Sequence, residues 1–129
     1  VQYEKIQELI KLGVAQGAKL VCGGEGRPDG FDKGYFVKPT VFADVTPEME
    51  IFKEEIFGPV LSIIPFKDQD HAIELANDTP YGLTNYVQTS DIDRARLLAR
   101  KLKSGMVEVN GQMLSPASPF GYLVAKEKK

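Results

Sequence analysis

The clearest amphipathic pattern lies at the start of the chain. Between residues 2 and about 16, apolar side chains recur at spacings of three and four, while charged and amide side chains occupy the other positions. This period predicts a helix. A second stripe follows Ser90-Asp91-Ile92-Asp93, which fits a capping box, and consists of Ile92, Ala95, Leu98, Ala99 and Leu102. Residues 68–77 show a weaker helical pattern after Asp68, a candidate helix cap.

Short β-rich runs separate these helices. Lys19-Leu20-Val21-Cys22 is one, and residues 35–42 form another that Pro39 interrupts, which favours an edge or bent strand. Residues 46–50 have the signals of a short helix. Residues 60–66 are almost continuously apolar, as in a strand that is covered on both faces. With runs at 83–87 and 106–109, the later order is strand, helix, strand, helix, strand, which predicts an α/β fold with a mostly parallel sheet and flanking helices.

Composition narrows the class of protein. The 129 residues are 43% hydrophobic and 26% charged, as in a soluble globular chain, and they are enough for one domain or a piece of a larger one. The formal charge of -2 gives no reason to expect nucleic acid or an anionic membrane as a partner. The first residues lack a secretory pattern, and no apolar run is long enough to span a bilayer, so a cytoplasmic protein is expected.

One short stretch combines charge, an aromatic ring and a turn. Lys53-Glu54-Glu55-Ile56-Phe57-Gly58-Pro59-Val60 leads through a Gly-Pro corner into the apolar run. Glycine permits an unusual backbone and proline fixes φ, so Glu55 and Phe57 are expected at a strand end, where α/β proteins place ligand groups. A carboxylate there can accept hydrogen bonds from a vicinal diol. Neighbours on an extended chain point to opposite faces, so at most one of Glu54 and Glu55 faces a ligand; the alternative is a solvated acidic pair.

Other chemically capable residues are few. One cysteine and one histidine exclude an internal disulfide and a four-ligand zinc site built from these residue types, so no metal site is expected. Cys22 has no base nearby in sequence and is interpreted as a small buried hydrophobe. His71 is interpreted as a surface residue. The loop after the last strand, from Asn110 onward, is either a pocket wall or a surface connection.

Several segments, taken together, resemble the aldehyde dehydrogenase family. The run from Lys53 to Val60 resembles a signature of that family. Further matching segments occur in the same order as in the family: Gly17-Ala18-Lys19-Leu20-Val21-Cys22-Gly23-Gly24, Gly34-Tyr35-Phe36-Val37-Lys38-Pro39-Thr40-Val41, Ala76-Asn77, Tyr81-Gly82-Leu83 and Gly105-Met106-Val107-Glu108-Val109-Asn110. The resemblance covers residues 1 to about 121.

The resemblance implies roles for six residues. Glu55 is expected to bind the hydroxyls of the nicotinamide-side ribose of NAD or NADP, with Phe57 packed near the nicotinamide. Gln2 and Lys5 fall where the family also contacts that ribose, and residues three apart on a helix can share a face. Asn110 and Phe120 match the floor and wall of the aldehyde pocket. These residues would position substrate and cofactor, and none is assigned a catalytic role.

The implied parent enzyme oxidises an aldehyde to a carboxylic acid through thiohemiacetal and thioester intermediates. The nucleophilic cysteine, the general-base glutamate and the dinucleotide-binding sheet of the family precede the region that this chain matches, and Cys22 matches a non-catalytic position. We therefore expect residues 1–129 to be a single partial domain, the later part of a catalytic domain, and to be inactive alone.

The end of the chain departs from the family. Residues 122–129 form a divergent basic tail in place of the segment that ends in a strand used for subunit assembly. The parent is expected to be a homodimer or homotetramer, and assembly of this chain stays in question. The alternative is a non-catalytic binding or structural module of the same fold.

Overall fold

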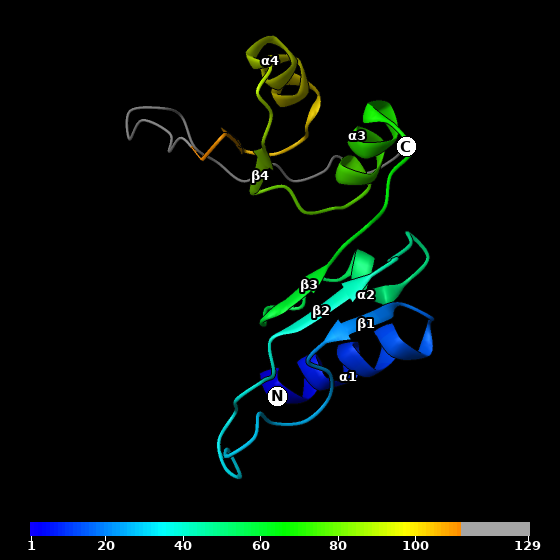
Figure 1. The fold of residues 1–129 in the computed structure, drawn as a ribbon, viewed down its shortest axis with the longest axis vertical. Coiled ribbons are helices and arrows are strands. Elements are labelled where there is room, and N and C mark those ends of the chain that lie inside the picture. The colour runs from blue at the N-terminus through cyan, green and yellow to red at the C-terminus, as the bar shows by residue number, and fades with distance from the viewer. Residues whose placement is uncertain (112–129) are drawn as a thin grey trace. The chain divides into compact units, whose positions relative to one another are not determined.

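The computed structural model describes residues 1–111. The chain divides into two compact units, Val1–Pro65 and Phe66–Lys129. The first unit contains α1 (Gln2–Ala15), β1 (Lys19–Cys22), β2 (Thr40–Ala43), α2 (Glu50–Lys53) and β3 (Val60–Ser62). The second contains α3 (Gln69–Asn77), β4 (Thr84–Val87), α4 (Ile92–Lys101) and β5 (Met106–Val109) (Figure 1). Phe120 and the tail 122–129 lie outside the described residues.

The sheet of the first unit has the strand order β1-β2-β3. β1 pairs antiparallel with β2, and β2 pairs parallel with β3. The prediction of an edge or bent strand around Pro39 is wrong for β2, because β2 is the central strand of this sheet. Pro39 is compatible with that position because the strand begins after it, at Thr40, whose N–H donates to the Pro59 carbonyl at 2.8 Å.

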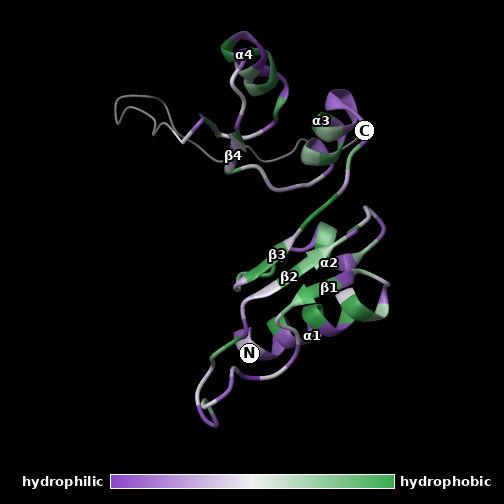
Figure 2. Ribbon diagram, viewed as in Figure 1, coloured by the Kyte–Doolittle hydropathy of each residue, from purple (hydrophilic) through white to green (hydrophobic). Residues whose placement is uncertain are grey.

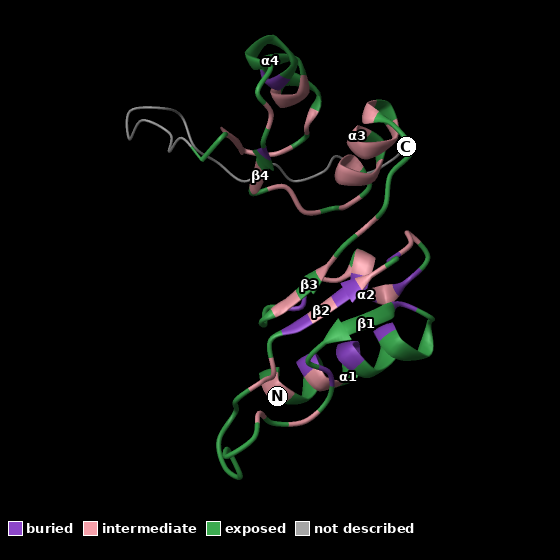
Figure 3. Cartoon of the chain, viewed as in Figure 1, coloured by how far each residue is buried: buried purple, intermediate pink, exposed green. Residues whose placement is uncertain are grey.

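The core of the first unit joins helices to one strand. α1 contributes Ile6, Leu9 and Ile10, and Phe42 of β2 is fully buried among them. Gly13 lets this ring approach the helix, because a Cβ at Gly13 would lie 3.1 Å from Phe42 Cζ. Ile51 of α2 closes the same cluster. The apolar and buried residues of α1 and β2 can be followed in Figures 2 and 3.

Two elements are shorter than their sequence patterns predicted. The helix expected at 46–50 begins only at Glu50, after an extended Met49. The strand expected over 60–66 ends at Ser62, and Leu61 and Ile63 are exposed. Cys22 is exposed at the end of β1 and is not the buried hydrophobe that was expected.

Residues 23–39 form the mostly exposed connection between β1 and β2, and its first part lies against α1. Gly26 N–H donates to Gln7 Oε1 at 2.6 Å. The Arg27 guanidinium lies 5.2 Å from the centre of the Tyr3 ring, within the range of a cation–π interaction. The loop therefore has specific contacts with the first two turns of the helix.

The second unit contains a strand–helix–strand crossover. α4 connects β4 to β5, which pair in parallel with Thr84 opposite Met106. Two of the three strand pairings in the described chain are thus parallel, and the α/β class with helices beside mostly parallel strands is confirmed. Among residues 1–111, no helix has the length and hydropathy required to cross a membrane.

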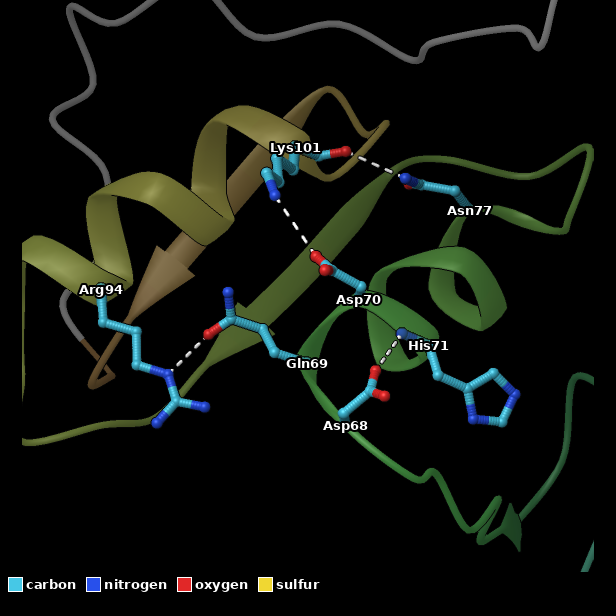
Figure 4. A network of polar contacts seen from close by, with 7 residues as sticks. All are labelled: Asp68, Gln69, Asp70, His71, Asn77, Arg94 and Lys101. Atoms are coloured by element: carbon cyan, nitrogen blue, oxygen red, sulfur yellow. Dashed lines mark hydrogen bonds and ion pairs between the residues drawn. The ribbon is translucent and has the colours of Figure 1, made fainter.

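Side chains connect α3 with α4 and the segment after it (Figure 4). Arg94 Nε donates to Gln69 Oε1 at 2.7 Å, and Lys101 Nζ lies 3.4 Å from Asp70 Oδ1. Asn77 bonds the last residue of α4 and the segment after it, because its Nδ2 donates to the Lys101 carbonyl and its Oδ1 accepts from Lys103 N–H. Exposed ion pairs contribute little, so the backbone contacts of Asn77 matter most here.

The caps of these helices partly match the sequence. Asp68 caps α3 as expected, since its Oδ1 accepts from His71 N–H at 2.9 Å. α4 is capped by Asp91, whose Oδ1 accepts from Arg94 N–H, so the predicted cap at Ser90 is off by one residue. Within the predicted stripe of α4, only Ala95 is buried, and Ile92 is exposed.

Candidate functional site

The first turns of α1 support the loop formed by residues 54–59, which we call the 54–59 loop. Ile56 inserts its side chain into the core cluster at 9% exposure. Two residues on, Gly58 lies so close to α1 that a Cβ there would be 2.8 Å from Ile6 Cδ1. The loop therefore packs directly against the helix, with Ile56 as its buried anchor.

The unusual backbone of this loop lies at Phe57, whereas the Gly-Pro corner had suggested Gly58. Phe57 has φ of 52°, in the left-handed region that bulky residues rarely occupy. Gly58 is not among the glycines with positive φ. Its small size is what the position needs, because Ile6 occupies the space that a side chain would fill. Ile6 is thus a residue of the site that the sequence alone did not reveal, although Gly58 marks the close contact.

Gln2 and Lys5 lie on the same side of α1 and both contact the loop. Gln2 Nε2 donates to the Ile56 carbonyl at 3.3 Å and to the Phe57 carbonyl at 3.1 Å. Lys5 Nζ lies 3.8 Å from Glu54 Oε2. Gln2 and Lys5, three apart in sequence, were expected to share a face of the helix, and both contact the same loop. Their contact with a ribose stays a prediction.

The two adjacent glutamates have different surroundings. Glu54 pairs with Lys5 and is partly buried. Glu55 is exposed, and within the described part of the chain its carboxylate has no hydrogen bond or ion pair. Glu55 is therefore the glutamate of this pair that is free to accept hydrogen bonds from a ligand.

These residues present an exposed aromatic ring and free polar groups on one loop. Phe57 is 77% exposed and offers a flat apolar surface, and the Glu55 carboxylate can accept two hydroxyl donors. Lys5 is half exposed and can add a donor while it remains near Glu54. The arrangement suits a ribose diol next to a planar ring. Among residues 1–111, no three metal-ligating side chains come together.

Asn110 belongs to the second unit and follows β5 directly. It has φ of 53°, which asparagine tolerates better than most residues. Its Oδ1 accepts from Thr89 N–H, and its Nδ2 donates to the Thr89 carbonyl, both at 2.9 Å. The side chain thus fixes the chain after β5 to the chain after β4. Its predicted place in an aldehyde pocket stays a prediction, and Phe120, its predicted partner, lies outside the described residues.

Replacing Asn110 with alanine should destabilise this junction by about 1 to 3 kcal/mol, because two hydrogen bonds are lost and alanine resists positive φ. Asn110→Gly is the matched control, since it loses the amide and tolerates the backbone. Urea unfolding measures the global effect, and hydrogen exchange at the Thr89 amide measures the local one. Unchanged Thr89 exchange in Asn110→Ala would contradict the assigned contact.

Comparison with known proteins identifies the family. The model of the aldehyde dehydrogenase family matches residues 1–122. This chain belongs to the aldehyde dehydrogenase family, as the resemblance of its segments predicted.

Individual relatives agree with the family match. A 3-succinoylsemialdehyde-pyridine dehydrogenase from a Pseudomonas species is 53% identical over 121 residues, which cover 94% of this chain and 25% of the relative. The crystal structure of an aldehyde dehydrogenase from Bartonella henselae is 58% identical with a TM-score of 0.92, over 95% of this chain and 26% of that one. A mutant of aldehyde dehydrogenase C from Pseudomonas syringae, solved with NAD+ and octanal, is 44% identical with a TM-score of 0.91. The match covers 95% of this chain and 25% of that one. The chain therefore spans about a quarter of the length of these relatives.

Proposed function

We propose that this chain is the part of an NAD(P)-dependent aldehyde dehydrogenase that positions the nicotinamide end of the cofactor. We call the longer polypeptide that would contain these residues the parent protein. The observation that carries the proposal is the 54–59 loop, which packs on α1 and exposes both the Phe57 ring and the Glu55 carboxylate. Among residues 1–111, this carboxylate has no hydrogen bond or ion pair. The Pseudomonas syringae relative was solved with NAD+ and octanal, which supports a nicotinamide cofactor and an aldehyde as ligands.

Each residue has a defined part in this proposal. The bound cofactor would accept a hydride from the substrate, and the residues of this chain would hold the cofactor in place. Glu55 accepts hydrogen bonds from the ribose hydroxyls, Lys5 adds a donor, and Phe57 limits how far the nicotinamide ring can move. Such positioning contributes to rate by keeping the reacting atoms in a near-attack arrangement. Asn110 and Phe120 would contribute to the aldehyde pocket of the parent protein.

The distribution of apolar surface supports a role as part of a larger domain. Leu20, Val21, Leu61 and Ile63 are exposed in the first unit. In the described part of the second unit, Val87 and Ala95 are the buried apolar residues. Large exposed apolar surfaces commonly mark contact with another part of a protein. We propose that residues 1–129 are a single partial domain of a cytoplasmic parent protein, that its other segments supply the nucleophile, and that the isolated chain has no turnover.

A glutamate comparison tests the cofactor role. In the parent protein, Glu55→Gln should weaken NADH binding by about 10-fold to 100-fold, because charge-assisted hydrogen bonds to the ribose are lost. Glu54→Gln is the matched control, since the neighbouring carboxylate faces Lys5, and it should change the affinity by less than about threefold. Fluorescence titration with NADH gives both dissociation constants. Equal affinity and equal hydride-transfer rate in Glu55→Gln and the unmodified protein would refute the role of Glu55.

A non-catalytic module of the same fold is the second candidate function. The exposure of Glu55 does not distinguish such a module from the enzyme, because both would keep the loop geometry. Single-turnover aldehyde oxidation by the parent protein separates them. A parent protein that binds NADH and produces no carboxylic acid would favour the module.

A further inference from the structure

The amide of Gln2 contacts main chain in the 54–59 loop. Its Nε2 carries two hydrogens, and it donates to two consecutive carbonyls, those of Ile56 and Phe57. The amide nitrogen of this side chain is therefore directed at the backbone of the loop. Its oxygen is left as the only group that could bind a ligand directly.

The backbone that Gln2 contacts is strained. Phe57 has φ of 52°, a conformation that persists in a bulky residue only where neighbouring groups hold it. On one side Gly58 packs against Ile6, and Pro59 restricts the chain that follows. On the other side Ile56 is buried in the core. Between these fixed points, the Gln2 amide provides the side-chain hydrogen bonds to the Ile56–Phe57 carbonyls.

The orientation of these two peptide units determines where the ligand-facing side chains point. Glu55 and Phe57 flank Ile56 and are both exposed, whereas Ile56 is buried. A rotation of the Ile56–Phe57 backbone would move the Phe57 ring and change its distance from the Glu55 carboxylate. The geometry of the pair thus depends on a residue that is more than fifty positions away in the sequence.

We propose that Gln2 is a positioning residue of the cofactor site, which acts by holding the Ile56 and Phe57 carbonyls so that Phe57 keeps its left-handed backbone and, with Glu55, faces the nicotinamide ribose. This inference rests on the proposed function and changes the role of Gln2 from a ribose contact to a support of the loop. It also explains why a glutamine suits the position, since glutamate has no donors for the two carbonyls.

The test uses Gln2→Met in the parent protein, because methionine keeps the length of the side chain and removes both donors. Gln16→Met is the matched control: Gln16 lies at the other end of α1, and its Oε1 accepts a hydrogen bond from Glu50 N–H at 2.7 Å. Hydrogen exchange of a peptide covering residues 56–61 is measured without cofactor. NADH dissociation constants are measured for Gln2→Met, for Glu55→Gln and for the double variant.

We expect Gln2→Met to accelerate exchange in residues 56–61 by about 5-fold to 30-fold, the effect of one or two lost hydrogen bonds, and Gln16→Met to leave this segment unchanged. Gln2→Met should weaken NADH binding about fivefold. In the Glu55→Gln background, the same substitution should change affinity by less than about twofold, because the carboxylate is already lost and only the Phe57 ring is left for the loop to position.

Three results would overturn the inference. Unchanged exchange in residues 56–61 would show that Gln2 does not hold the loop. Equal losses of affinity from Gln2→Met with and without Glu55→Gln would show an independent, direct contact with the ribose. The third result is accelerated exchange in Gln2→Met with unchanged NADH affinity. If Glu55→Gln still weakens NADH binding, only this inference is overturned. If Glu55→Gln has no effect either, the proposed function is overturned as well.

Discussion

Replacing Gly23 with alanine should destabilise the first unit by about 2 to 5 kcal/mol. Gly23 follows β1 and has φ of 79°, a region that residues with a side chain rarely adopt. A Cβ there would collide with the Pro39 carbonyl oxygen and would lie 2.7 Å from Thr40 Cα. Both neighbours are main-chain atoms at the start of β2, so neither can move aside without shifting the central strand.

Gly17→Ala is the control for this experiment. Gly17 also has positive φ, 95°, but a Cβ at this position would have no atom of the described residues within 4 Å beyond its chain neighbours. Its replacement should cost about 1 to 2 kcal/mol from backbone strain alone. Urea unfolding of the 129-residue chain gives both values. If both variants lose the same free energy of unfolding, the close approach of Gly23 to β2 does not contribute to stability.

Phe42→Ala should remove about 3 to 5 kcal/mol of stability, because the fully buried ring fills the space between α1, α2 and β2. This loss is comparable to the total stability of a small domain, so cooperative unfolding of the first unit should disappear or shift to very low urea concentration. The Phe42 ring lies next to Gly13, whose lack of a side chain allows α1 to approach β2 closely.

Phe66→Ala provides the comparison with the same residue type, since Phe66 is 62% exposed. It should change the stability by less than about 1 kcal/mol. Circular dichroism during urea titration measures both variants. A Phe42→Ala chain as stable as Phe66→Ala would contradict the assignment of Phe42 to the centre of the core.

Local patterns predicted the elements whose causes are local. The periodic stripe near the start of the chain gave α1 to within a residue or two, and Asp68 capped α3 as its side-chain chemistry suggests. Pro39 was misleading because the rule against proline concerns residues inside a strand, and this strand starts one residue later. The short helix was placed too early because Met49, inside the predicted range, is extended and the helix begins only after it. β3 proved shorter than the apolar run because hydrophobicity does not fix how far two strands pair.

The candidate site could be predicted in part for the same reason. The Gly-Pro corner placed Glu55 and Phe57 just before an expected strand, and both are exposed before β3, while their contact with a cofactor stays a prediction. The pairing of Glu54 with Lys5 and the contact of Gly58 with Ile6 could not be read from spacing, since both join distant parts of the sequence. Resemblance to the family named Gln2, but only the structure shows that its amide contacts main-chain carbonyls.

The hydrogen bonds from Gln2 to the 54–59 loop also bear on the order of folding events. They close a ring of more than fifty residues, and the chain entropy of closing so large a ring must be offset before the loop gains its shape. The loop should therefore reach its final backbone only after α1 and the Phe42 core have come together. A synthetic peptide of residues 53–60 would lack the contacts that hold Phe57 in its left-handed conformation, and it should populate extended structures with no measurable affinity for NADH.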